Sequence, residues 1–129
     1  MNAGSTDHAI GLAHFSAGRI TDALTSFSKA LREADSSEFW NDWAAAQFAL
    51  GSKEEAEAGF RLALALDAKF VQAAVNLGAL LFDQRNYAEA LPFLEIASSD
   101  SNLQQSAIAS SLLAKSRSAV TDQLPSSLI

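Results

Sequence analysis

Apolar residues recur along this chain at spacings of three and four positions, and no segment shows sustained alternation of apolar and polar residues. The segments 44–50 and 56–66 show this spacing clearly. Such spacing places apolar side chains on one face of a helix, whereas a strand requires a period of two. Ala and Leu, which are abundant here, are also strong helix formers. The pattern therefore predicts an all-α protein.

The predicted helices end where Gly or Asn can adopt the left-handed conformation that terminates a helix, at 17–18, 51–52 and 84–86. Glu54, Glu55 and Glu57 fall in the first turns of the fourth helix, where they favour its dipole. We interpret that charge cluster as a solvated helix start and not as a catalytic or metal site. Helices are expected over residues 5–17, 20–34, 37–50, 53–66, 70–84 and 87–99.

Three segments of the chain align with one another at steps of 33 and 34 residues. Several columns of small or apolar residues keep this register twice, which chance would not produce. The columns are Ala23, Ala56 and Ala90; Phe27, Phe60 and Leu94; Ala30, Ala63 and Ala97; Gly11, Ala44 and Gly78; and Ile10, Trp43 and Leu77. Because one helix pair cannot bury its apolar face alone, successive pairs must stack.

The columns resemble the tetratricopeptide repeat (TPR) family, whose unit of about 34 residues is a pair of antiparallel helices. The third segment carries the family's Leu-Gly and its two Ala positions as Leu77-Gly78, Ala90 and Ala97, and it also carries Tyr87. The chain departs from the family at the closing Pro and at a Tyr slot. Those two columns hold Asp35, Ala68 and Asn102, and His14, Gln47 and Leu81. The resemblance spans roughly residues 4–104 and implies a right-handed α–α superhelix.

The columns predict a packing scheme. The small residues at Gly11, Ala44 and Gly78, and at Ala23, Ala56 and Ala90, should let the two backbones of a unit approach closely. The large residues at Phe27, Phe60 and Leu94 should fill the space between one unit and the next.

We expect a single domain over residues 1–129, with repeats at 4–36, 37–70 and 71–104. A capping helix over 103–120 should follow, because a polar-backed helix hides the apolar end of a solenoid. Its apolar stripe is expected to contain Leu103, Ala107, Leu112 and Ala114, with serines, Ser116 among them, on the other side. The tail 121–129 has no periodicity and contains Pro125, so we expect it to be extended or disordered. Its apolar ending suggests a docking segment or a chain cut from a longer one.

Composition excludes several classes of protein. The 129 residues include 9 Lys+Arg and 15 Asp+Glu, and the net charge of -6 argues against a nucleic-acid partner. The absence of Cys removes disulfides, thiolate zinc sites and Cys nucleophiles, and it fits a reducing, cytoplasmic setting. No signal peptide is evident, and no apolar run approaches the roughly 20 residues that cross a bilayer. We expect no membrane association.

Catalytic chemistry finds no support in the sequence. His8 and His14 are six positions apart in one helix and face different sides, so they cannot together chelate a metal from that helix. His14 is expected to pack in the Tyr slot and His8 to be exposed. No Gly-rich phosphate loop and no strand–turn–helix nucleophile elbow are present. We expect no enzyme activity, no cofactor and no metal.

The resemblance implies a concave groove, lined by the first helix of each unit, that binds extended or helical peptides. The groove positions carried over by the resemblance are Ser5, His8, Leu12, Phe15, Ser16, Glu38, Asn41, Asp42, Ala45, Phe48, Ala49, Gln72, Val75, Asn76, Ala79, Phe82 and Asp83. Phe15, Phe48 and Phe82 should form a ladder of peptide anchors, or alternatively they pack partly against neighbouring helices. The chaperone-adaptor members clamp a terminal carboxylate with Lys, Asn and Arg, but these positions hold no Lys or Arg. A carboxylate clamp is therefore not expected.

The leading functional hypothesis is a non-catalytic protein-interaction module, a monomer or weak homo-oligomer. Its partner would be a peptide that is apolar with basic flanks, because Glu38, Asp42 and Asp83 lie at the groove. One alternative is an N-terminal accessory or substrate-recognition domain of a larger bacterial glycosyltransferase or methyltransferase, since the run 39–44 resembles such chains. A second alternative is a self-assembly element that buries Trp40 or the tail.

Overall fold

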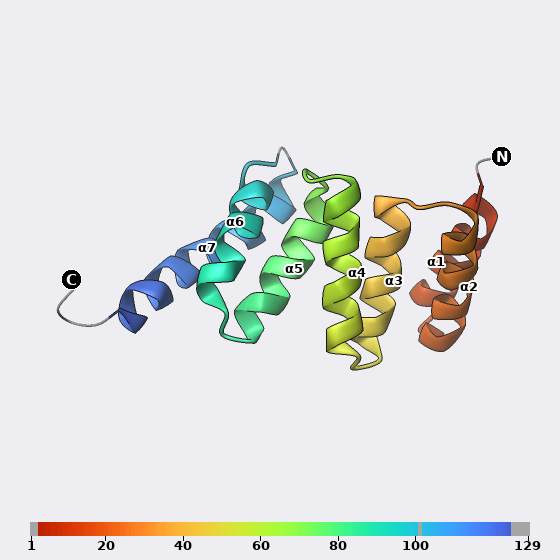
Figure 1. The fold of residues 1–129 in the computed structure, drawn as a ribbon, viewed down its shortest axis with the longest axis horizontal. Coiled ribbons are helices and arrows are strands. Elements are labelled where there is room, and N and C mark those ends of the chain that lie inside the picture. The colour runs from red at the N-terminus through yellow and green to blue at the C-terminus, as the bar shows by residue number, and fades with distance from the viewer. Residues whose placement is uncertain (1–2, 101, 125–129) are drawn as a thin grey trace. The chain divides into compact units, whose positions relative to one another are not determined.

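The computed structural model of the chain describes residues 3–100 and 102–124. Within these residues the chain forms seven α-helices and no strand. The helices are α1 (Ser5–Ser16), α2 (Ile20–Glu33), α3 (Ser37–Ala49), α4 (Lys53–Leu66), α5 (Val71–Asp83), α6 (Tyr87–Ser98) and α7 (Leu103–Gln123). They divide into two compact units, unit 1 (Met1–Phe70) with α1 to α4 and unit 2 (Val71–Ile129) with α5 to α7 (Figure 1). The prediction of an all-α fold is confirmed.

The first six helices begin and end within one residue of the predicted positions. In contrast, α7 continues through Thr121–Gln123, so the expectation of an extended or disordered tail is wrong for those three residues. The hydroxyl of Thr121 donates to the carbonyl of Arg117 one turn earlier, at 3.1 Å. The helix stops just before Leu124, which precedes Pro125, and a residue before proline disfavours the helical conformation. Residues 125–129 lie outside the described part of the chain.

The turn that joins the two helices of each pair has the same hydrogen-bonded motif in all three pairs. In the first pair, the amide of Arg19 donates to the carbonyl of His14 at 2.9 Å, and Gly18 takes a φ of 81°. This bond and this left-handed residue define a Schellman C-cap. The second and third pairs repeat it, with left-handed Gly51 and Arg85. The expectation that Asn86 would take the left-handed conformation is wrong, because Asn86 has a φ of -88° and begins the next helix.

Gly11 and Gly78 have no Cβ atom, and this leaves room for a large side chain from the second helix of the same pair. A Cβ atom at Gly11 would lie 2.5 Å from the Phe27 ring, and one at Gly78 would lie 2.5 Å from Leu94. Phe27 also belongs to a buried cluster with Ala23 and with Ala46 of the next pair. Phe27 therefore fills space within its own pair as well as between pairs. The expected burial of Phe27, Phe60 and Leu94 is confirmed.

In unit 2, α7 contacts both α5 and α6. Its buried residues are Ala109, Leu113 and Ser116, at spacings of four and three. The predicted stripe is wrong at Ala107 and Ala114, which are exposed, and the predicted polar side is wrong at Ser116, whose hydroxyl is buried without a hydrogen-bond partner. Leu112 is half-buried, and the side chain of Leu103 lies outside the described part of the chain. Because alanine and serine side chains are similar in size, either can pack against α5 and α6, and the pattern of apolar residues did not identify the packed face of α7. Within the described residues, no helix is both long and apolar enough to cross a membrane.

Candidate functional site

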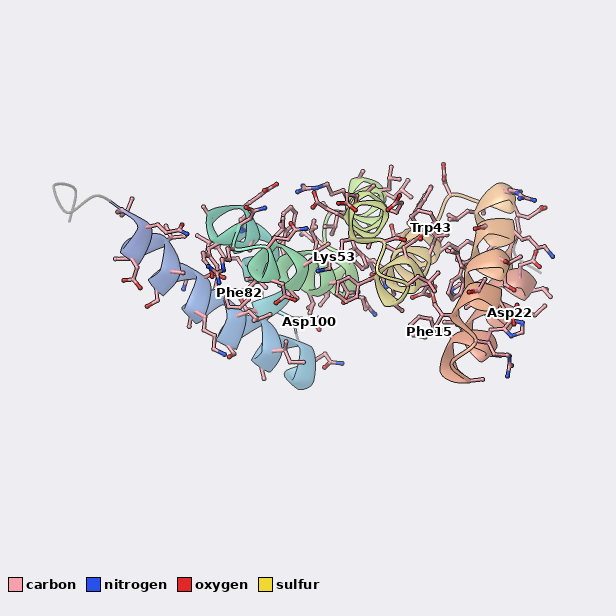
Figure 2. All side chains as sticks on the ribbon, turned by 90° about the horizontal axis from the view of Figure 1, so that it is seen from below. Phe15, Asp22, Trp43, Lys53, Phe82 and Asp100 are labelled. Carbon is pink, nitrogen blue, oxygen red and sulfur yellow. The ribbon has the colours of Figure 1, made fainter. Side chains whose placement is uncertain are left out.

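The first helices of the two pairs in unit 1, α1 and α3, carry eleven of the positions assigned to the groove by resemblance. Some of these side chains form the packing between α1 and α3, and others remain exposed. Phe15 belongs to the first group, since it is half-buried against the cluster of Phe27, Ala23 and Ala46, as is Trp43 (Figure 2). Phe15 therefore contributes to the floor of this face more than to its exposed surface.

His8 is buried, with 7% of its surface exposed, so the expectation of an exposed His8 is wrong. Its ring centroid lies 4.6 Å from that of Phe39 on α3, at an interplanar angle of 30°. On another side, the Phe27 ring lies 5.7 Å away. Two aromatic rings from two other helices thus hold the imidazole in one place. The sequence could not show this, because Phe39 comes from the next repeat.

The buried imidazole is satisfied by a carboxylate. His8 Nε2 lies 2.6 Å from Asp42 Oδ2. A carboxylate can only accept, so the Nε2–H group of His8 donates this hydrogen bond. The neighbouring Asn41, itself 6% exposed, donates from Nδ2 to the other oxygen of Asp42 at 3.3 Å. Asp42 therefore links α1 to α3 and has a fixed orientation.

Among the assigned positions on this pair of helices, two large apolar side chains remain exposed to solvent; Ile10 on α1, which is not an assigned position, is also 45% exposed. Leu12 on α1 is 41% exposed and Phe48 on α3 is 43% exposed. Ala45, one turn before Phe48 on the same helix, is half-buried and small. Glu38, at the start of α3, is exposed and adds negative charge.

In unit 2, the corresponding positions are on α5. Val75, Asn76 and Ala79 are half-buried, while Asp83 is exposed. Phe82 is half-buried and packs edge-on against Tyr87 of α6, with ring centroids 5.3 Å apart. Phe82 is labelled in Figure 2. Phe82 thus has an intramolecular partner, which is the alternative that the sequence left open for the aromatic column.

His14, the second histidine, has a separate environment. It is half-buried, and its Nδ1 accepts a hydrogen bond of 2.9 Å from Arg19 Nε. His8 and His14 therefore have different partners. The carboxylates near His8 are Glu38 and Asp42 of α3, which are 30 and 34 residues away in sequence, and reasoning within one helix could not identify them.

Comparison with known proteins places this architecture among solved TPR domains. No family model matches the chain, and no curated protein matches it in sequence. The Sgt2 TPR domain from Aspergillus fumigatus is 20% identical, with a TM-score of 0.78 over 95% of this chain and 82% of that one. The first TPR domain of Spaghetti (RPAP3), bound to an HSP90 peptide, is 22% identical, with a TM-score of 0.80 over 92% and 96% of the two chains.

A bacterial structure shows the same likeness. The Yersinia enterocolitica type III secretion chaperone SycD, in complex with a peptide of the translocator YopD, is 19% identical. Its TM-score is 0.80 over 87% of this chain and 90% of that one. At sequence identities this low, the structural similarity establishes the fold of this chain but not its ligand. The described part of the chain has the TPR fold, with the helix pairs α1–α2, α3–α4 and α5–α6 followed by α7.

Proposed function

We propose that the chain is a non-catalytic protein-interaction module that binds a peptide or helical segment of a partner on the face of α1 and α3. The observation that carries this proposal is the exposure of Leu12 and Phe48 on those two first helices. Exposed apolar side chains on one face are typical of binding surfaces, and aromatic anchors carry much of the energy in such interfaces. Phe15 and Ala45, which are apolar and half-buried, are assigned to the same binding surface by repeat register.

Charge defines the chemistry of the proposed partner. The acidic residues among the assigned positions are Glu38 and Asp42 in unit 1 and Asp83 in unit 2. Because none of these positions carries Lys or Arg, a partner ending in a free carboxylate would meet repulsion. A ligand with apolar anchors and basic flanks is complementary. Its binding should weaken as salt rises, since exposed charges are screened.

The solved structures support this proposal by analogy of fold. The RPAP3 domain is bound to an HSP90 peptide, and SycD is in complex with a YopD peptide. By repeat register, we extend the proposed binding positions to Val75, Asn76, Ala79, Phe82 and Asp83 of unit 2. His8 and Asn41 are buried, so we assign them to the wall behind the ligand and not to its direct contacts.

A peptide-display screen against the purified chain tests the proposal. Enriched ligands should be apolar with basic flanks, and Phe48→Ala should weaken their binding by about tenfold, as loss of an apolar anchor does. The matched control is Leu62→Ala, because Leu62 on α4 is also 43% exposed but is not an assigned position. Equal binding by wild type and Phe48→Ala, or enrichment of acidic peptides with free C-termini, would overturn the proposal.

A further inference from the structure

The junction of α1 and α3 brings together three side chains that commonly bind metal ions. His8, Glu38 and Asp42 each offer one ligand atom, and these atoms all lie within 4.8 Å of one another. His8 comes from α1, while Glu38 and Asp42 lie one turn apart on α3. Residues four positions apart on a helix lie on the same face, which explains how both carboxylates approach one imidazole.

We propose that His8, Glu38 and Asp42 form a binding site for one divalent first-row metal ion, with Zn²⁺ the best match. One imidazole nitrogen and two carboxylate oxygens are a ligand set that Zn²⁺ accepts, and the fourth tetrahedral position remains for water. Imidazole favours the later first-row ions over Mg²⁺ and Ca²⁺, which prefer oxygen ligands alone. The two carboxylates also balance the charge of the ion.

Neighbouring side chains orient two of the three ligands, His8 and Asp42, before any ion binds. Phe39 and Phe27 hold the imidazole, and Asn41 holds one oxygen of Asp42, so that the other oxygen faces His8. Groups that orient metal ligands in this way raise affinity because fewer conformations are lost on binding. Glu38 is exposed, so the site has an open side through which an ion and its water can enter.

The hydrogen bond between His8 and Asp42 must give way to the ion. Its two atoms are 2.6 Å apart, whereas two ligands at about 2.0–2.1 Å from a tetrahedral ion are about 3.3 Å apart. A displacement of the Asp42 side chain by about 0.7 Å, without a change in which oxygen faces His8, supplies this difference. The imidazole proton then has to be on Nδ1, since Nε2 binds the metal. The ion would occupy Glu38 and Asp42, the carboxylates that the proposed peptide binding also uses, so Zn²⁺ is titrated without peptide and the result does not depend on peptide binding.

Calorimetric titration of the full, tag-free chain with Zn²⁺ tests the proposal, with Co²⁺ absorption as a second readout. One equivalent should bind, and Glu38→Gln and Asp42→Asn should each weaken binding by at least about tenfold. Glu38→Gln is the safest variant for folding, because Glu38 is exposed. Circular dichroism of each variant verifies that it remains folded.

Two substitutions serve as matched controls. His14→Gln removes the other histidine, and Glu54→Gln removes an equally exposed carboxylate near the start of α4. Both should bind Zn²⁺ within about twofold of wild type. In nitrogen-detected NMR of the histidines, Zn²⁺ should perturb Nε2 of His8 and leave His14 unchanged. The proposal is overturned if no saturable binding occurs, if Glu38→Gln and Asp42→Asn bind like wild type, or if His14→Gln abolishes binding.

Discussion

At the scale of single residues, the packing of this chain depends on pairs of very small and very large side chains. Gly11 leaves space that the ring of Phe27 fills, and Gly78 does the same for Leu94. On α4, Gly59 lies so close to Trp43 and Ala44 that a Cβ atom would be 2.7 Å from the Ala44 methyl group. Close packing of this kind makes the loss of one large partner costly, because the backbone can relax only partly.

Phe60 is the large residue of the second repeat and is 3% exposed. We predict that Phe60→Ala lowers the free energy of unfolding by about 3–5 kcal/mol, as large-to-small core substitutions do. Urea denaturation measures the change. The control is Leu62→Ala, because Leu62 lies on the same helix and is 43% exposed, and we expect it to cost about 0.5 kcal/mol or less. A Phe60→Ala midpoint equal to that of wild type would refute the assigned register.

Burial of His8 illustrates why some residues could not be placed from the sequence. Its helix position indicates a first-helix face, but its packing partners Phe39 and Asp42 belong to another repeat. Sequence periodicity reports which face a residue occupies and not which side chain covers it. Phe27, in contrast, was placed correctly, because its column is large and apolar in all three repeats.

At the level of helices and turns, the repeat register predicts which residue ends a helix better than the conformational preference of single residues does. Gly18 and Gly51 have φ values of 81° and 84°, and Arg85 occupies the same column with a φ of 64°. The preference of Asn for the left-handed conformation pointed instead to Asn86, one position later. Register therefore identifies the turn residue correctly even where the residue type is unfavourable. The face of α7 was mispredicted because that helix lies outside the repeats and has no second copy to align.

The left-handed Arg85 gives a prediction for the third turn. An L-residue in this conformation costs about 1–2 kcal/mol, and glycine avoids that cost. Arg85→Gly should therefore raise the free energy of unfolding by about 1 kcal/mol. This value already allows for the greater conformational entropy of glycine in the unfolded chain, which offsets part of the gain. Thermal or urea denaturation detects the change.

Gly51→Ala is the reciprocal control for this turn. A Cβ atom at Gly51 would meet nothing within 4 Å, so any loss of stability there reflects backbone conformation alone. We expect a loss of about 1 kcal/mol. If Arg85→Gly is neutral or destabilising while Gly51→Ala behaves as expected, the Arg85 side chain itself must stabilise the turn.

At the scale of the whole molecule, the junction between the second and third predicted repeats coincides with the boundary between the two compact units. That boundary lies between Phe70 and Val71. We propose, from the continuous repeat register, that the chain is nevertheless one domain of three repeats and a seventh helix. The fold could be predicted because the pattern occurs three times. The partner could not, because the exposed positions of a repeat protein are the ones that its packing leaves free to vary.

NMR mapping distinguishes ligand binding by the first helices from binding elsewhere on the chain. A peptide from the display screen should be titrated into isotope-labelled chain while the amide and methyl resonances are followed. We predict the largest shifts at Leu12, Ala45 and Phe48 on α1 and α3, with smaller changes at Leu62 and Leu66, which are similarly exposed on α4. Shifts that concentrate on Leu62 and Leu66, or on Ile108 of α7, with none on α1 and α3, would show that the first helices do not bind the ligand.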